Sequence, residues 1–330
     1  MNKIHMKSSC CNKKIYSFGP RRYQCSFCKK TWRIRLKKRG RKKIRVTTNI
    51  VKDVLLRGET LSQRSKRGRL SKKQYLLRYH RSLDHIKNKD FFLEVPKGKL
   101  ILIVDGLWVI SNKKRYVVYL MAIRSINKIE AILLPPIILS GSEIRKKWEL
   151  AIQTIPIFVK NNIIAIVCDG ISGLPNIAKN ERWIIQRCNF HFIKTIERFR
   201  GKKNKYIQNK ELREDMYQMI RKAMIVPDGI EYVETINNLE KLALNNDCPK
   251  WVRIHANEFL RHRESFRSYL RYPKYNLPFT TSSMENLCGS VRDLLRRSRG
   301  FKTEKSLYEW IREFIKLKKK IICRGKNQPN

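Results

Sequence analysis

The chain has 330 residues, with 74 lysines and arginines against 27 aspartates and glutamates, and thus a formal net charge of +47. A charge of that size favours a polyanionic partner and would give DNA affinity that falls as salt rises. The 42% of hydrophobic residues excludes a disordered basic tail and argues against a small ribosomal protein. No apolar run reaches the length of a membrane span and no signal peptide is evident, so we expect a cytoplasmic protein without a membrane partner.

The N-terminal segment looks like a small module that carries cysteines. Cys25 and Cys28 have the spacing that lets two thiolates bind one tetrahedral Zn²⁺. The odd total of nine cysteines also fits reduced thiols and metal better than disulfides. A second pair of ligands should lie upstream across a hairpin, where either His5 or Cys11 would join Cys10. Adjacent cysteines rarely ligate one ion well, so we predict Cys10 and His5. The alternative is a hairpin without metal.

A basic linker and three short helices follow. Apolar spacing and turn residues predict these helices within residues 47–86, with Ser71 as the cap of the longest one. Helix, short helix, glycine turn and long basic helix is the order of a helix-turn-helix, whose last helix contacts DNA. Arg78 and Arg81 on that helix are the candidate contacts. The alternative is a generic helical linker.

From residue 99 the hydrophobic pattern becomes that of strands. Three apolar runs in quick succession predict antiparallel neighbours, and alternating helices and strands continue to about residue 200. This order is typical of an RNase H-like mixed sheet of five strands. Asp105 ends an apolar run on the first strand, and Asp169 lies at the end of the fourth. A carboxylate in that position is costly to bury unless it is paired or liganded, so both are candidate metal ligands, although either alone could be a strand-end cap.

A third carboxylate lies far downstream. Residues 201–275 look like charged helices inserted into the fold, and the next predicted helix carries Glu285 near its start. Mg²⁺ prefers oxygen ligands, and phosphodiester chemistry benefits from two ions, one on each reacting oxygen. Asp105, Asp169 and Glu285 are therefore the candidate ligands of two Mg²⁺ or Mn²⁺ ions, although a glutamate there would also suit the helix dipole.

Two further groups of residues carry weaker signals. Cys188 and His191 have metal-like spacing but supply only two local ligands, so a structural cysteine and a capping histidine would also explain them. Arg292, Arg296 and Arg297 follow on the helix of the downstream glutamate. An arginine cluster beside a metal site suits phosphate binding, and the alternative is a solvated helix face.

Together these motifs resemble the DDE transposases of bacterial insertion sequences in the Mutator-like group. The resemblance rests on Asp105 and Asp169, on the Cys-x-x-His signature of Cys188 and His191, and on the segment around Glu285. It implies that the two aspartates and the glutamate are the catalytic residues. In related enzymes a tryptophan of the insertion contacts DNA near the cut. Trp251 could play that part here, or it could be a core residue.

The resemblance implies a nucleoid-associated bacterial enzyme that binds the terminal inverted repeats of its own element. It would cleave DNA with metal ions and join the freed 3′-hydroxyl to target DNA, without ATP. Two element ends must be held together, so a homodimer or a larger assembly on DNA is expected. The alternatives are a catalytically silent DNA-binding regulator derived from a transposase and an RNase H-fold nuclease that hydrolyses without joining.

The sequence thus predicts an α/β protein in five segments. They are a zinc-ribbon-like module at 1–36, a basic linker and helix-turn-helix at 37–96, the first part of the catalytic core at 97–200, the helical insertion at 201–275 and the C-terminal catalytic helices at 276–330.

Overall fold

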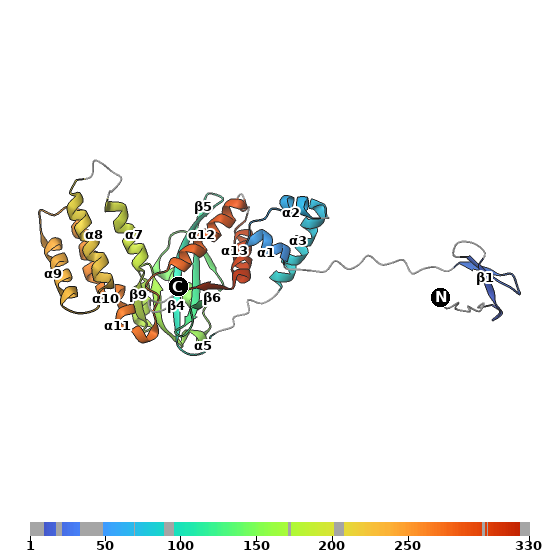
Figure 1. Ribbon diagram of the computed structural model, residues 1–330, viewed down its shortest axis with the longest axis horizontal. Helices are drawn as coiled ribbons and strands as arrows, with labels where there is room; N and C mark the ends of the chain where they lie inside the picture. Colours follow the sequence, from blue (N-terminus) through green and yellow to red (C-terminus); the bar gives the residue numbers. More distant parts are fainter. Residues whose placement is uncertain are drawn as a thin grey trace. The chain divides into compact units, whose positions relative to one another are not determined.

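The computed structural model divides the chain into two compact units, Met1–Val46 and Thr47–Asn330 (Figure 1). It describes residues 10–17, 22–33, 49–68, 70–88, 96–170, 173–200, 208–298, 301 and 303–323. The predicted basic linker and the ligand candidate His5 lie outside these stretches. Within them, no helix combines the length and the apolar character needed to cross a membrane.

The smaller unit is a three-stranded antiparallel sheet. Its strands are β1 (Ile15–Ser17), β2 (Arg22–Cys25) and β3 (Thr31–Arg33). Cys25 is the one fully enclosed side chain among its described residues. Strands this short bury too little apolar surface to hold a fold together by themselves, so the unit needs another source of stability.

Three helices open the larger unit, in the order that the sequence predicts. They are α1 (Asn49–Leu55), α2 (Leu61–Arg67) and α3 (Lys72–Lys87). A capping box begins α2 at Thr60 and another begins α3 at Ser71, the predicted cap. Buried side chains of α1 and α3, such as Leu55 and Leu83, belong to the same apolar cluster as the central sheet. These helices are therefore part of the larger unit.

A mixed sheet of seven strands forms the centre of that unit. The strands are β4 (Leu100–Ser111), β5 (Lys114–Ser125), β6 (Glu130–Leu133), β7 (Ile137–Ser140), β8 (Ile163–Cys168), β9 (Ile184–Arg187) and β10 (Lys320–Ile322). Their order is β10-β6-β5-β4-β8-β9, and β7 also pairs with β5. The β4–β8 and β8–β9 pairs are parallel, whereas the other pairs are antiparallel. The fold is thus mixed α/β, as predicted.

Two of these strands were not predicted, so the sheet exceeds the expected five. Pro135 and Pro136 end the third apolar run, and the residues after them return to pair with β5 as β7. The other added strand, β10, has three residues and extends the edge at β6 from the far end of the chain. Neither strand is long enough to show a period in the sequence.

Helices cover both faces of the sheet. One face packs against α4 (Arg145–Gln153), α5 (Ile157–Lys160) and α6 (Leu174–Asn180). The other packs against α12 (Ser282–Arg297) and α13 (Glu304–Lys318). The alternation of side chains along β4 explains the division, since Ile101 and Ile103 face α12 and α13 whereas Leu102 and Val104 face α4.

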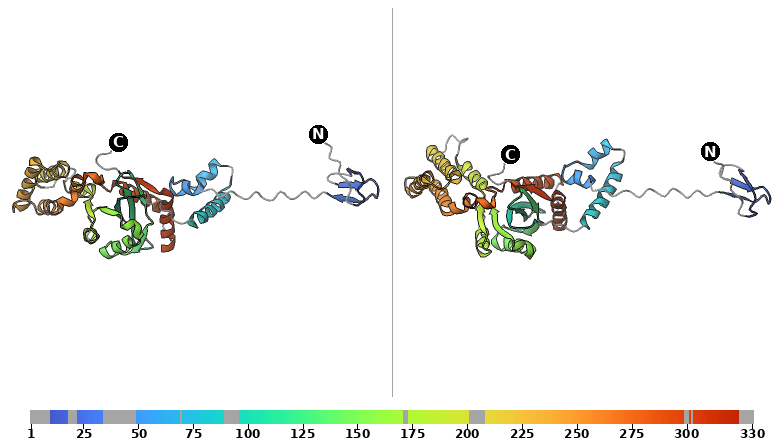
Figure 2. Two further views of the ribbon diagram at one scale, coloured as in Figure 1. Left: turned by 90° about the horizontal axis from the view of Figure 1, so that it is seen from below. Right: turned by 60° about the horizontal axis from the view of Figure 1, so that its bottom comes forward.

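The predicted insertion is helical and has a core of its own. Within residues 201–275 it comprises α8 (Lys210–Ile225), α9 (Ile230–Leu244), α10 (Lys250–Phe266), α11 (Ser268–Arg271) and the short turn η1 (Pro273–Tyr275). The helix α7 (Asn189–Arg200), which was expected to belong to the sheet segment at 97–200, packs into the core of the insertion. Phe192 of α7, Ile220 of α8 and Phe259 of α10 meet in that core. Figure 2 shows the insertion, in yellow to orange, gathered at one end of the sheet and α1–α3 at the other.

Candidate metal centres

Two aspartates occupy corresponding positions on neighbouring parallel strands. β4 and β8 pair with Ile103 opposite Val167, and each aspartate follows two residues later, as Asp105 and Asp169. Ile103 and Val167 are both buried on the α12 face, and Asp105 points to that face because side chains alternate along a strand. The negative charge of Asp169 raises the pKa of Asp105. The parallel register therefore brings together the two acids that the sequence singled out.

The first turn of α12 adds a glutamate, and α7 adds a histidine. Oε1 of Glu285 lies 2.6 Å from Nε2 of His191. One ligand atom from each of Asp105, His191 and Glu285 can be chosen so that all three lie within 4.8 Å of one another. Asp169 is not part of this group of three. His191, which the sequence analysis identified only through the family resemblance, thus belongs to the site.

Burial and like charges strain the Asp105 carboxylate. The residue is 5% exposed, and Sγ of Cys288 donates a weak hydrogen bond to its Oδ2 at 3.5 Å. Loss of solvation and then the charge of Asp169 raise the pKa of Asp105 to about 7; the charge of Glu285 also raises it, whereas His191 and the Cys288 hydrogen bond lower it. A divalent cation would relieve this repulsion, and the carboxylate oxygens present fit Mg²⁺ or Mn²⁺.

A chain of hydrogen bonds explains the Cys-x-x-His motif. The backbone N–H and the hydroxyl of Thr281 both donate to Sγ of Cys188, at 3.1 and 3.2 Å. The same hydroxyl lies 3.2 Å from Nδ1 of His191, whose other ring nitrogen contacts Glu285. Burial lowers the pKa of His191, but the hydrogen bond and charge of Cys188, the charge of Asp105 and the hydrogen bond to Glu285 outweigh burial and raise it to about 9. The motif therefore orients the glutamate.

The residue before this motif holds the turn that follows Asp169. Nη2 of Arg187 donates to the carbonyl of Gly170 at 3.5 Å, and Nη1 is 3.0 Å from Glu258 in α10. Gly170 has a φ of +88°, and a Cβ there would overlap the Arg187 guanidinium. Glycine is therefore required at that turn for two reasons, its left-handed backbone and its close contact with the arginine.

A fourth carboxylate, absent from the sequence prediction, lies on the other side of β4. Glu143 accepts a hydrogen bond of 2.9 Å from Nε1 of Trp148, and its carboxylate occupies the space where Gly106 would carry a Cβ. Desolvation and then the charge of Asp169 raise the pKa of Glu143 to about 7. The sequence signal was the glycine that directly follows Asp105, which leaves room for another side chain.

The predicted DNA contacts lie in different surroundings. Arg78 and Arg81 are exposed on α3. Arg292 is exposed on α12, and its Nη1 lies 3.9 Å from Oε2 of Glu285. Trp251 packs against the core of the insertion, with the Arg213 guanidinium 4.2 Å from its ring centroid. Of these side chains, Arg292 is therefore the one in contact with the carboxylate group.

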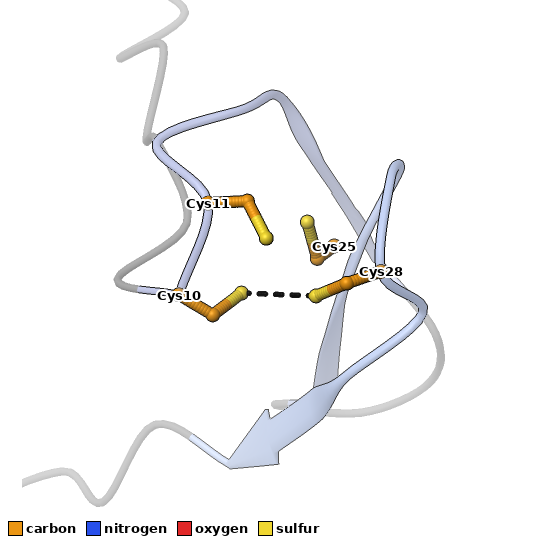
Figure 3. A group of neighbouring side chains, drawn as sticks. All are labelled: Cys10, Cys11, Cys25 and Cys28. Atoms are coloured by element: carbon orange, nitrogen blue, oxygen red, sulfur yellow. Dashed lines mark hydrogen bonds between the residues drawn. The ribbon is translucent and has the colours of Figure 1, made fainter.

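The smaller unit contains a second group of metal-ligand side chains. The sulfur atoms of Cys10, Cys11, Cys25 and Cys28 all lie within 4.8 Å of one another (Figure 3). Figure 3 shows Cys10 and Cys11 on one stretch of backbone opposite Cys25 and Cys28, with 3.3 Å between the sulfur atoms of Cys10 and Cys28. The adjacent cysteines thus both contribute, against the expectation that they seldom share an ion. Cys11, the alternative to His5, belongs to this group, whereas His5 lies outside the described residues.

The arrangement of these four cysteines favours thiolates that bind a metal ion. The backbone N–H of Lys30 hydrogen-bonds to the sulfur of Cys28 and lowers the pKa of that thiol, with Cys10 and Cys11 adding to the effect. Hydrogen bonding to Cys28 and then desolvation raise the pKa of Cys11 to about 12, with smaller effects of Cys10 and of the charges on Cys10 and Cys28. Four sulfur ligands are the usual set of structural Zn²⁺. This group can therefore hold a metal such as zinc.

No family model matches the chain, and no curated protein matches it either.

Proposed function

We propose that this chain is a DDE transposase that binds the ends of its own element and catalyses metal-dependent cleavage and transfer of DNA strands. The observation that carries the proposal is the convergence of Asp105, His191 and Glu285, from three elements far apart in sequence, beside Asp169. This acidic centre belongs to a chain with a formal charge of +47, which favours a polyanionic substrate.

The topology supports an RNase H-like core. Three successive antiparallel strands, β4 to β6, are followed by the parallel strands β8 and β9 with helices between them. The resemblance places its first acid on the first of these strands and its second acid at the end of the fourth. Asp105 and Asp169 stand at those positions. Strands β7 and β10 would be additions to that core.

The residues of the site would have different roles in metal binding, positioning and phosphate binding. Asp105, Asp169 and Glu285 would hold two divalent ions, which supply Lewis-acid activation of the attacking and leaving oxygens. His191 would act as a positioning residue, because it touches the glutamate and is itself fixed by Thr281. Arg292 would lie close enough to this group to bind a phosphate oxygen.

The smaller unit and α1–α3 would read DNA. We propose that the four cysteines bind one structural Zn²⁺, which would replace the missing apolar core of that unit. The helices α1–α3 stand in helix-turn-helix order, with the exposed Arg78 and Arg81 on the last of them. A homodimer or larger assembly would bring two element ends together.

The test is a cleavage and joining assay with the full chain, Mg²⁺ or Mn²⁺, and DNA that includes both flanks of the gene. The wild type should nick the flanks and join the freed ends to a second DNA molecule. Asp105→Asn and Glu285→Gln should lose both reactions while retaining DNA binding. Glu234→Gln, an exposed acid of α9, is the matched control and should retain all activity.

Three results would contradict the proposal. Nicking without joined products would assign the chain to RNase H-fold nucleases. Specific binding with no nicking by the wild type would assign it to silent regulators. Full activity of Asp105→Asn would remove the metal assignment itself.

A further inference from the structure

A groove lies where α1 meets α12 and α13, away from the carboxylate group. Its volume is about 540 Å³, and its lining includes Arg57 in the turn after α1, Arg296 and Arg297 at the end of α12, and Lys318 at the end of α13. Phe314, which is 2% exposed, forms part of its apolar floor. A hollow of this size is within the range of about 300–1,000 Å³ that ligand pockets occupy.

Positive charge dominates the groove. Four basic side chains face one acid, Asp293, and that acid already pairs with Arg296. Arg57 pairs with Asp53, but its side chain is 80% exposed, so it remains accessible to a ligand. Cations gathered in a hollow repel one another, and a bound anion would offset that repulsion.

The groove is built into the fold rather than formed by flexible surface residues alone. Gly58 has a φ of +73°, and a Cβ there would overlap the guanidinium of Arg297. Nε of Arg297 also donates to the backbone carbonyl of Asp293 at 3.1 Å. Arg297 is therefore held against the turn after α1, and it connects the helices α1–α3 to α12.

A second hollow extends the basic surface along the turn after α1 and along α2. It has a volume of about 320 Å³ and is lined by Arg57, Glu59 and Arg67, with Gly58 and Gln63. Its acid, Glu59, is already within salt-bridge distance of Arg64 and Arg67. Since Arg57 borders both hollows, one continuous basic track leads from α12 to α2.

We propose that this groove binds phosphates of the nucleic-acid backbone and clamps one strand between α1–α3 and the catalytic face. Guanidinium groups match phosphate oxygens in charge and geometry, and the lining offers three of them. The helix α12 carries Glu285 in its first turn and Arg296 in its last. Eleven residues of helix span ~17 Å, which equals about five base pairs of duplex. The inference rests on the proposed function, because that function supplies the nucleic acid.

The test compares two double variants of the full chain. Arg57→Gln with Lys318→Gln removes two cations of the groove without touching the metal centres. Lys128→Gln with Lys179→Gln is the matched control, because both lysines are exposed, one in the β5–β6 turn and one on α6. The affinity of each protein for a 30-base-pair duplex, a length of about three helical turns, is measured over a range of salt concentrations. Melting temperatures confirm that each variant is folded.

The slope of log affinity against log salt should become shallower by about 2 in the groove variant, since each lost phosphate contact contributes about 0.9. The loss should be uniform across unrelated duplexes, and the control should keep the slope of the wild type. An unchanged slope in the folded groove variant would overturn the proposal. An equal loss in the control would also overturn it, because the effect would then come from overall charge.

A measurement with inorganic phosphate distinguishes binding of free phosphate from binding of the phosphates of a DNA backbone. If phosphate raises the melting temperature of the wild type but not of the groove variant, while their DNA slopes agree, the groove binds free phosphate and the backbone proposal fails. The proposed function is tested apart from this by nicking with the wild type. If the wild type never nicks DNA but the groove variant has a shallower slope, the transposase proposal is rejected and the proposal that the groove binds DNA phosphates is kept.

Discussion

Replacing Asp105 by asparagine should make the metal-free protein more stable at pH 8 and leave its stability unchanged near pH 4. The pKa of Asp105 is raised from 3.8 to about 7 in the folded state, first by desolvation and then by Asp169. Between these values the unfolded chain releases the proton and the folded chain retains it. The free energy of unfolding therefore falls as the pH rises through that window, and the loss is complete above pH 7.

The size of the effect follows from the shift. About 3 pH units at about 1.4 kcal/mol per unit give an upper bound of about 4 kcal/mol. Local relaxation around the carboxylate reduces this, so we expect about 2 kcal/mol, or roughly 4–8 °C in melting temperature for a unit of this size. Asparagine mimics the protonated acid in shape and cannot carry the charge, so Asp105→Asn removes the penalty without leaving a cavity.

The assay is thermal and urea unfolding in EDTA at pH 4, 6 and 8, with Glu234→Gln as the control for loss of one acid. Adding Mg²⁺ at pH 8 should then stabilise the wild type and have little effect on Asp105→Asn, because an ion that binds only the folded state adds to its stability. A variant that is equally stable or less stable than the wild type at pH 8 would refute the argument that this carboxylate is strained.

Three further predictions concern single contacts. Gly106→Ala should lower the free energy of unfolding by about 1–3 kcal/mol, because its Cβ displaces the Glu143 carboxylate. This loss of stability should vanish in a Glu143→Ala background, and an equal loss in both backgrounds would exclude the clash. His191→Gln should destabilise the metal-free protein at pH 6, and the difference should shrink as the pH rises from 6.5 through about 9, since the raised pKa stabilises the fold only while the ring is charged. Elemental analysis should find one zinc per chain in the wild type, less in Cys11→Ser, and an unchanged amount in Cys248→Ser, whose cysteine lies in the insertion; zinc retained by Cys11→Ser would show that the adjacent cysteine is not a ligand.

The elements that the sequence predicts well are those whose pattern is local. The strand Ile163–Cys168 is an unbroken apolar run between turn residues, and α12 has a clear apolar stripe, so both were located almost to the residue. The convergence of Asp105 and Asp169 follows from two such runs that pair in parallel, although β4 continues past Asp105 to Ser111. Such patterns need no knowledge of the rest of the fold.

What the sequence did not reveal depends on contacts between distant segments. Glu143 belongs to a loop with no motif, and only the packing of α4 against β4 places it beside Gly106. The membership of His191 in the carboxylate group depends on where α12 starts relative to α7. The place of Cys11 beside Cys10, Cys25 and Cys28 depends on how the chain before β1 folds back on the β2–β3 turn. Spacing along one chain contains none of this information.

The two residues before the Cys-x-x-His motif connect the insertion to the central sheet. The side-chain amide of Gln186 donates to the carbonyl of Phe266 and accepts from the N–H of Tyr269, while Arg187 bonds both to Glu258 and to Gly170. A tilt of the insertion would therefore pull on the backbone that carries Asp169. These contacts attach the insertion to the carboxylate group, so we expect a change in the position of its outer helices to alter the geometry of that group without any direct contact.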